Sequence, residues 1–155
     1  MQVQETLAAA GVAFSVHHHP PIRSEADLHR TNLDQTTSVK TLAFELPDGR
    51  LALVGVPGPF RVRYGAIAQA LGVPRSQLRP ATEERLRAVG MEPGGVSPVC
   101  SDGETVVLLD EAVPAMGAVF CGGGTPTSTL SVEASEILRV AAHPLVAAIA
   151  EPPRG

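Results

Sequence analysis

Helical periodicity marks four stretches of the chain, each bounded by residues that start or stop a helix. Helices are expected over residues 2–10, 66–71, 82–90 and 133–140, the last of which either ends there or resumes after Pro144. Gly11, Gly72 and Gly90 end the first three, because glycine readily adopts the left-handed conformation that closes a helix. The stretch from Ser24 to Asp27 has the Ser-x-x-acid spacing of a helix cap and predicts a further short helix.

Apolar and β-branched runs between these helices predict strands. Residues 37–46 and 51–56 flank an Asp-Gly pair, which is a strong hairpin signal. Residues 96–100 and 104–110 repeat the pattern around a second Asp-Gly pair, and residues 118–121 add another short strand. Hairpins interspersed with helices favour an α+β or mixed α/β fold, in which helices pack on a mixed, largely antiparallel sheet.

Length and composition indicate one domain over residues 1–155, because 16.1 kDa is enough for one core and no internal repeat interrupts the chain. The apolar runs are too short to span a bilayer and the amino terminus lacks a signal pattern, so we expect a cytoplasmic protein. The two cysteines, Cys100 and Cys121, form no Cys-x-x-Cys motif and are expected to be buried, reduced thiols.

The charge balance limits the kinds of partner that the surface can bind. A net charge of −4 argues against a surface devoted as a whole to a polyanion, and only five of the residues are Tyr or Phe, too few for a base-stacking platform. A local basic patch is compatible with the acidic total. Its candidates are the pairs Arg61 and Arg63, Arg75 and Arg79, and Arg85 and Arg87, which could equally be separate, solvated positions.

Lys40 is the only lysine among twelve basic residues. Alternation along its strand places it on the face that carries Leu42, Phe44 and Leu46. A charge on an apolar face needs a pocket or a partner, since an unpaired buried charge costs several kcal/mol. Lys40 therefore either binds a phosphate or carbonyl oxygen at the mouth of a cleft, or extends its ammonium along the strand to water.

The stretch GMEPGGVSPVC, residues 90–100, combines flexible and rigid backbone. Glycine allows φ angles and close approaches that other residues forbid, whereas proline fixes φ. Gly94, Gly95 and Pro98 together predict a shaped loop that presents backbone N–H groups to a ligand.

Four segments in order, SVKTLAF, LALVGVPG, GMEPGGVSP and FCGGG, resemble the YbaK-like and prolyl-tRNA-synthetase-associated family of aminoacyl-tRNA deacylases over about residues 10–135. Lys40 matches the lysine of the family's Val-Lys-Thr-Leu strand, and residues 94–98 match its Gly-x-x-x-Pro loop. The resemblance implies a curved mixed sheet flanked by helices. It also implies hydrolysis of the ester that joins a wrong amino acid to the 3′ end of tRNA, here by a free-standing protein that edits in trans.

The resemblance also implies the site residues and partners. Catalytic roles are expected for Lys40, Gly94, Gly95, Val96, Ser97 and Pro98, and substrate contacts for His19, Leu42, Gly122 and Gly123. Fixed backbone N–H groups would stabilise the oxyanion, and activated water, helped by the ribose hydroxyl of the substrate, is favoured over a covalent intermediate. The expected partner is a mischarged tRNA, such as tRNA-Pro carrying Ala, Ser, Cys or Thr, with a synthetase or elongation factor as further candidates and no cofactor.

Two features depart from the family pattern. Val99-Cys100 follows the loop where many relatives have Phe-Gly, and a His-Pro-Leu sequence seen in some prolyl-editing relatives occurs here only at His143.

Two other functions compete with editing as interpretations of the sequence. His17 and His19 could bind zinc with Cys121 or His143, although no complete ligand set is evident, so no metal is expected. The domain could also be a catalytically silent module that recognises an aminoacyl-tRNA end or an amino acid.

Overall fold

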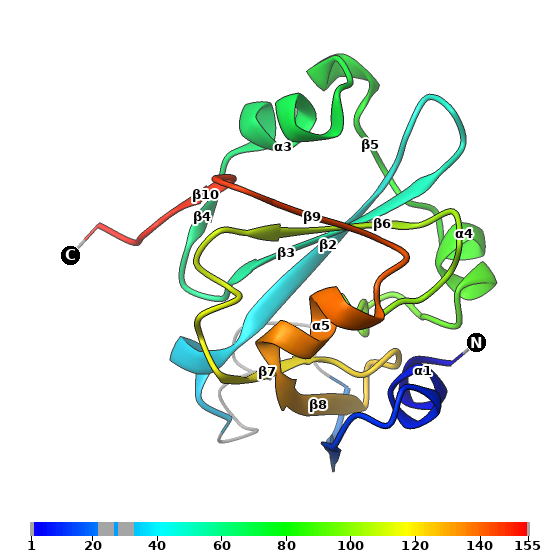
Figure 1. The fold of residues 1–155 in the computed structure, drawn as a ribbon, viewed down its shortest axis with the longest axis vertical. Helices are drawn as coiled ribbons and strands as arrows, with labels where there is room; N and C mark the ends of the chain where they lie inside the picture. Colours follow the sequence, from blue (N-terminus) through cyan, green and yellow to red (C-terminus); the bar gives the residue numbers. More distant parts are fainter. Residues whose placement is uncertain (1, 22–26, 28–32, 155) are drawn as a thin grey trace.

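The computed structural model describes residues 2–21, 27 and 33–154 and has an α+β fold (Figure 1). Helix α3 covers one face of a five-stranded sheet, and helices α1 and α5 with a three-stranded sheet lie on the other side. The predicted fold class is therefore confirmed. The short helix expected from Ser24 lies outside the described residues. No helix in the described ranges is long and apolar enough to cross a membrane.

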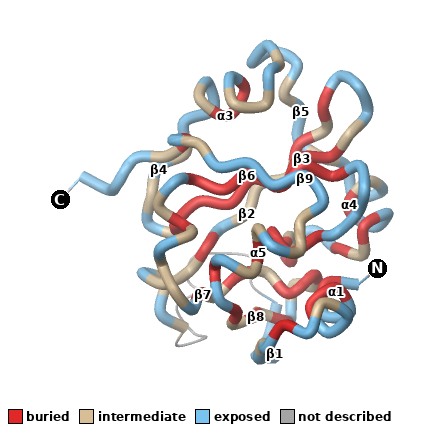
Figure 2. Tube along the Cα trace, in the orientation of Figure 1, coloured by how far each residue is buried: buried red, intermediate tan, exposed pale blue. Residues whose placement is uncertain are grey.

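The five-stranded sheet is mixed and has the order β5-β2-β3-β6-β9. Its strands are β2 (Val39–Glu45), β3 (Leu51–Pro57), β5 (Arg79–Pro80), β6 (Val106–Asp110) and β9 (His143–Ala147). β2 and β3 form the predicted hairpin, in which Val39 pairs with Pro57 and Glu45 with Leu51. β6 is parallel to both β3 and β9. Every residue of β3 and β6 is buried, because both faces of the sheet are covered (Figure 2).

The second sheet is antiparallel and has the order β1-β8-β7. It consists of β1 (Phe14–His18), β7 (Ala118–Gly122) and β8 (Ser128–Glu133). β7 approaches the start of β2, where Ser38 and Phe120 form an isolated parallel bridge. A separate two-stranded ribbon joins β4 (Arg61–Val62) to β10 (Ala150–Glu151). The two larger sheets thus meet along β2 and β7.

The helices end where the glycine signals place their stops. They are α1 (Val3–Ala9), α3 (Tyr64–Leu71), α4 (Glu83–Ala88) and α5 (Ala134–Val140), with single 3-10 turns η1 (Gln35–Thr37) and η2 (Arg75–Gln77). Gly11, Gly72 and Gly90 have φ angles of 70°, 71° and 79°, in the left-handed region that glycine tolerates. The Thr82 hydroxyl accepts a hydrogen bond from the Arg85 N–H and caps α4.

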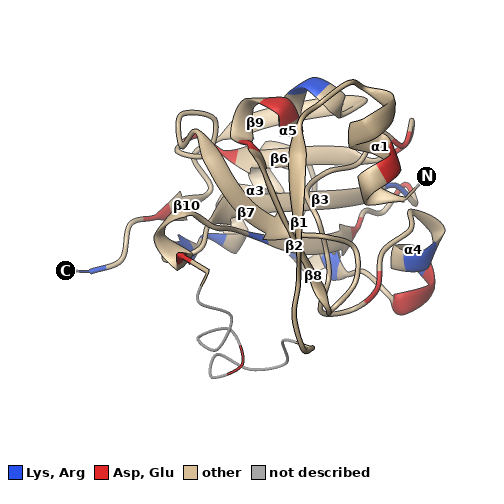
Figure 3. Ribbon diagram, turned by 90° about the horizontal axis from the view of Figure 1, so that it is seen from below, with Lys and Arg blue, Asp and Glu red and all other residues tan. Residues whose placement is uncertain are grey.

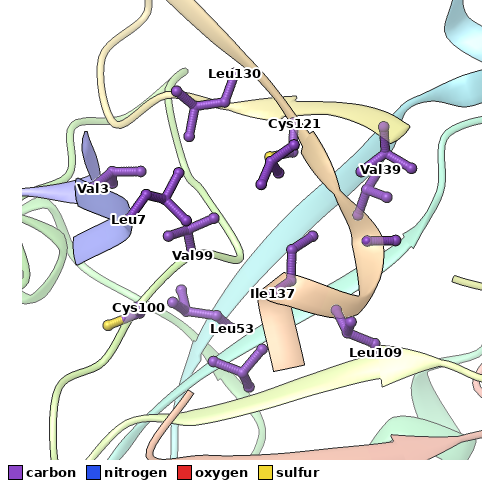
Figure 4. Close-up of a cluster of buried hydrophobic side chains, with 14 of the residues drawn as sticks. Val3, Leu7, Val39, Leu53, Val99, Cys100, Leu109, Cys121, Leu130 and Ile137 are labelled. Atoms are coloured by element: carbon purple, nitrogen blue, oxygen red, sulfur yellow. The ribbon is translucent and has the colours of Figure 1, made fainter. Parts of the chain in front are cut away.

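Two hydrophobic clusters lie on opposite faces of the five-stranded sheet. The larger includes Leu53 and Leu109 from the sheet, Leu7 from α1, Leu130 from β8 and Ile137 from α5 (Figure 4). The smaller lies under α3 and is formed by six fully or nearly fully buried residues: Phe44, Val54, Val56, Ile67, Leu108 and Ile149. Successive residues of β3 enter different clusters, as the alternation of side chains along a strand requires.

The prediction of a second hairpin is wrong. Residues 96–100 form a buried irregular loop, and β6 has β3 and β9 on its two edges, so no edge remains for a hairpin partner. The local turn signal is real, because the Asp102 carboxylate accepts hydrogen bonds from the Glu104 N–H and the Thr105 hydroxyl. A turn of this kind fixes the chain direction over a few residues, whereas strand pairing depends on the whole sheet.

Other elements were missed or misassigned from the sequence. The segment after Pro144 is the edge strand β9 and not a continuation of α5. β1 and β8 were not predicted, although apolar residues alternate in both, at Phe14 and Val16 and at Leu130 and Val132. The short strands of the second sheet are half-buried, and their apolar runs are too brief to stand out from loop sequence.

Candidate functional site

A cavity of about 320 Å³ opens where η1, β2 and β7 meet. Its walls come from four parts of the chain. They are His19; Leu33, Asp34, Gln35, Ser38, Val39, Lys40 and Thr41; Gly94 and Val96; and Phe120, Cys121, Gly122, Ser128 and Thr129. The cavity therefore lies at the junction of the two sheets, with the predicted lysine and part of the predicted loop in its walls.

Lys40 lies at the start of β2 and is exposed. Its Nζ donates a hydrogen bond to the Phe60 carbonyl oxygen at 2.6 Å. Partial burial lowers the pKa of Lys40 from its usual value of 10.5, because desolvation disfavours the charged form. Leu42 and Phe44, on the same face of the strand, pack into the cluster under α3. Lys40 thus shares the apolar strand face that the alternation predicts, and it lines the cavity.

The loop before Val99 is held against a second glycine-rich segment by backbone hydrogen bonds. The Glu92 N–H donates to the Gly124 oxygen and the Gly124 N–H donates to the Gly95 oxygen, both at 2.8 Å. Gly94 has a φ of 84°, which closes the turn that begins at Glu92. These bonds connect the predicted Gly-x-x-x-Pro loop to the FCGGG stretch at the end of β7.

Glycine is required where these two segments touch, because their backbones are in direct contact and leave no room for a side chain. A Cβ at Gly95 would overlap the main chain of Thr125, and a Cβ at Gly122 would overlap the carbonyl group of Val96. A Cβ at Gly123 would lie 2.5 Å from the Ser128 hydroxyl. The sequence predicted that the backbone at Gly95 would approach a ligand closely. In the structure it approaches the Thr125 backbone instead, and this contact fixes the position of Val96 in the cavity wall.

Two backbone donors of the loop remain available to a ligand. The N–H groups of Gly95, Ser97 and Val99 donate to the Glu92 oxygen, the Met91 sulfur and the Ser97 hydroxyl. The N–H groups of Gly94 and Val96 have no hydrogen-bond partner within the described part of the chain, and both residues line the cavity. They are the candidates for holding a carbonyl oxygen or an oxyanion.

Two nucleophile-type side chains at or behind the cavity wall, Cys121 and Ser97, are unsuited to covalent chemistry. Burial raises the pKa of the Cys121 thiol to about 12, so almost none of it is thiolate at neutral pH. Ser97 is fully buried behind the cavity wall, where its hydroxyl accepts a hydrogen bond from the Val99 N–H. Both cysteines are buried, free thiols, as the sequence predicts.

A polar wall on the opposite side of the cavity was largely missed from the sequence. The His19 Nε2 lies 2.8 Å from the Thr129 hydroxyl, and its Nδ1 lies 2.9 Å from the Pro20 oxygen. Ser128 shares a hydrogen bond of 2.8 Å with the Thr125 hydroxyl. The hydroxyl residues of STLSVE were the sequence signal for Ser128 and Thr129. They indicate a site only once β8 is paired with β1 and β7.

Of the residues expected at the site, the structure brings His19, Lys40, Gly94, Val96 and Gly122 together around one cavity. Four other expected residues do not line the cavity but lie next to residues that do: Gly95, Ser97, Pro98 and Gly123. Leu42 was expected to contact substrate, but it packs under α3 and not in the cavity wall. Leu42 and the cavity-lining Thr41 point to opposite faces of β2, and Leu42 lies farther into the strand than Lys40, which shares its face but lines the cavity from the start of β2.

The histidines do not converge on a metal site. No group of three His, Cys, Asp or Glu side chains arranged to hold a metal ion occurs among residues 2–21, 27 and 33–154. The His17 ring packs edge-on against Phe120, with 5.6 Å between ring centroids. His143 lies in the other sheet and its Nε2 is 2.7 Å from the Gly103 carbonyl oxygen.

The structure is thus an α+β domain with one lysine and free backbone N–H groups among the residues that line its cavity. Residues 19–140 match the aminoacyl-tRNA editing domain, and the chain belongs to that family. Among solved structures, it is similar to a candidate trans-editing enzyme for prolyl tRNA synthetase. That likeness has 28% sequence identity and a TM-score of 0.77, and it covers 96% of this chain and 94% of the other.

The fold is also shared with a crystal structure described only as that of a hypothetical protein. Identity is 24% and the TM-score 0.78, with 97% of this chain and 100% of the other covered. No curated protein matches the chain. The predicted family resemblance is thus confirmed, and it extends over the stretch that contains both Lys40 and the Gly94–Pro98 loop.

Proposed function

We propose that this protein is an aminoacyl-tRNA deacylase that hydrolyses the ester of a mischarged tRNA in trans. The observation that carries the proposal is the meeting of Lys40 with the free N–H groups of Gly94 and Val96 at one cavity. Membership of the editing domain family and the likeness to a candidate trans-editing enzyme support it. A cation and two aligned donors suit an ester whose carbonyl oxygen gains charge during hydrolysis.

In the proposed reaction, water attacks the carbonyl carbon of the aminoacyl ester. The resulting tetrahedral oxyanion accepts hydrogen bonds from the N–H groups of Gly94 and Val96, and each such donor is worth about 2.7–4 kcal/mol of barrier. Lys40 orients the ester or the phosphate of the terminal nucleotide as a compact point charge. The C–O bond to the ribose then breaks, the ribose oxygen takes up a proton, and the free amino acid leaves.

Water is the proposed nucleophile because neither the thiol nor the buried serine at the cavity wall is activated. The Cys121 thiol is kept protonated by burial and the Ser97 hydroxyl lies behind the wall. The neighbouring ribose hydroxyl of the substrate can take the attacking water's proton or orient the water. This assignment predicts no acyl-enzyme intermediate.

The proposed substrate carries a small amino acid, such as Ala, Ser, Cys or Thr, on tRNA-Pro or a related tRNA. A cavity of about 320 Å³ must hold the amino acid together with part of the terminal nucleotide. A small compartment excludes a larger cognate amino acid by size, which is how a second sieve edits errors that the first site cannot reject.

A panel of tRNAs mischarged with single amino acids tests the proposal directly. Release of amino acid should exceed the buffer rate for at least one small residue, and the Lys40→Ala variant should abolish most of it. Binding of mischarged tRNA without release would favour the second candidate, a silent recognition module. The silent module remains a candidate because no Ser-His-Asp arrangement is evident in the described cavity wall.

A further inference from the structure

Residues 49–82 contain five arginines and no aspartate or glutamate, in a protein whose net charge is −4. This segment runs from the β2–β3 turn through β4, α3 and β5. The acidic partners of Arg50, Arg61 and Arg63, which are Asp48 and Glu151, come from outside the segment, so the segment itself is uniformly positive. Within it, Gly58 and Phe60 hydrogen-bond to the cavity-lining residues Ser38 and Lys40.

The cavity rim is connected to this segment by Lys40. Its Nζ bonds to the carbonyl oxygen of Phe60, and Arg61 is the next residue along the chain. Lys40 lies on the face of β2 whose Leu42 packs with Val62 in the cluster under α3. The ammonium and the β4 strand are therefore on the same side of the five-stranded sheet.

Arg61 of β4 and Arg63, the residue after β4, point outward. Arg61 and Arg63 are exposed and flank Val62, which packs inward, as the alternation of a strand requires. Glu151 of β10 lies 3.9 Å from Arg61 and 3.5 Å from Arg63, so a single carboxylate serves both guanidinium groups and one positive charge remains. Figure 3 shows basic segments beside β10, which itself carries an acidic one.

An aromatic ring adjoins the arginines. Tyr64, the first residue of α3, is 42% exposed, and the guanidinium of Arg75 lies over its ring at 6.0 Å from the centroid. Exposed tyrosine rings and arginine planes are the surfaces on which unpaired RNA bases stack. Guanidinium groups also bind phosphate oxygens through two parallel hydrogen bonds.

We infer that Lys40, Arg61, Arg63, Tyr64 and Arg75 form the surface on which the phosphate backbone of the tRNA acceptor end docks while its aminoacyl terminus occupies the cavity. The inference rests on the proposed function. RNA leaving the cavity past Lys40 would pass close to β4, since the Lys40 Nζ bonds to Phe60, the residue before Arg61. The surface then supplies affinity for the RNA, whereas the cavity supplies the chemistry.

The test compares a long and a short substrate. The double variant Arg61→Gln, Arg63→Gln should lower kcat/KM for a mischarged tRNA by at least about tenfold, because each contact to a charged group is worth about that much. It should leave kcat/KM for a 3′-aminoacyl-adenosine, which lacks the backbone, unchanged. The matched control Arg87→Gln, Arg139→Gln removes the same charge from α4 and α5 and should affect neither substrate. Circular dichroism checks that each variant is folded.

Binding of uncharged tRNA-Pro transcript, measured by fluorescence anisotropy, separates this inference from the proposed activity. The slope of log affinity against log salt should become shallower by about 1.4–1.8 in the β4 double variant, the contribution of two phosphate contacts. An equal loss on both substrates, an equal loss in the control pair, or an unchanged salt slope would overturn the inference. If no substrate is hydrolysed by the unmodified protein, the proposed function fails while the binding result still decides the surface.

Discussion

Lys40 shows how one side chain can be both partly embedded and chemically available. Lys40 lines the cavity, its stem leaves an apolar strand face, and its Nζ bonds to the Phe60 carbonyl oxygen. The sequence left two alternatives for Lys40, ligand binding at a cleft and extension of the ammonium along the strand to water. The structure is compatible with both at once. Because the Nζ already has one protein acceptor, two of its three donors remain to be directed at a ligand.

Replacement of Lys40 therefore tests geometry as well as charge. Lys40→Ala should abolish most deacylation with the fold intact, and Lys40→Arg should not restore it, because the larger planar head displaces the substrate. A displacement of about 1 Å can cost on the order of 10²-fold in rate. Single-turnover rates measure this. Near-native activity of Lys40→Arg would show that charge alone is needed.

Cys121 tests the assignment of water as nucleophile. Cys121→Ala should keep deacylation within about tenfold and cost about 1–2 kcal/mol of stability from the small void left. In the unmodified protein the thiol should resist iodoacetamide at pH 8, where a pKa of about 12 leaves the thiolate scarce. Loss of all activity in Cys121→Ala, with the fold retained, would instead indicate a covalent intermediate.

The raised pKa of Cys121 also has a consequence for stability against pH. The folded protein holds the thiol proton up to about pH 12, whereas the unfolded chain releases it above its ordinary pKa of 9.0. The free energy of unfolding should therefore fall as pH rises from about 9 towards 12, and the part due to Cys121 should disappear in Cys121→Ala. Denaturant titrations at pH 8 and pH 10 measure the difference between the two proteins.

At the scale of elements, the site depends on two glycine-rich loops that touch through their backbones. The loop around Gly95 and the segment around Thr125 exchange hydrogen bonds, and Gly122 lets the Val96 carbonyl approach β7. The free N–H groups of Gly94 and Val96 are held in place by these contacts. The loops therefore fix the donors in advance of substrate binding, which is the condition for strong oxyanion stabilisation.

Gly95→Ala should separate these loops. The added methyl group meets the Thr125 backbone, which cannot rotate away, so we expect a loss of about 1–3 kcal/mol of stability and a larger proportional loss of turnover. Gly103→Ala is the matched control, because nothing lies within 4 Å of a Cβ there. Thermal melts and single-turnover rates compare the two. Full activity in a folded Gly95→Ala protein would remove the loop from the mechanism.

At the scale of the whole molecule, two sheets of different character meet at the cavity. The buried five-stranded sheet supplies Lys40, while the antiparallel sheet supplies the wall at Phe120 and Thr129. Basic residues of the β4–α3 surface extend from the same rim, although the molecule as a whole is acidic. Chemistry and RNA binding can therefore occupy adjoining regions of one side of the protein.

No convergent metal-ligand set occurs among the residues that the structure describes, and this leads to a prediction for the whole protein. Deacylation should survive incubation with EDTA, since His17 packs on Phe120 and His143 lies in the other sheet. Elemental analysis of the purified protein should find no stoichiometric zinc. Recovery of lost activity on adding zinc after chelation would contradict this.

The sequence by itself determined the local features of this protein. These are the helix ends at Gly11 and Gly72, the first hairpin and the strand face of Lys40. They depend on backbone preferences and strand alternation, which act over a few residues. Family motifs added the loop at Gly94. Only the tertiary structure decided that β6 lies between two parallel neighbours, that Leu42 turns away from the cavity and that Thr129 faces it. These depend on pairing between strands far apart in the chain, where the packing of the whole sheet outweighs local propensity.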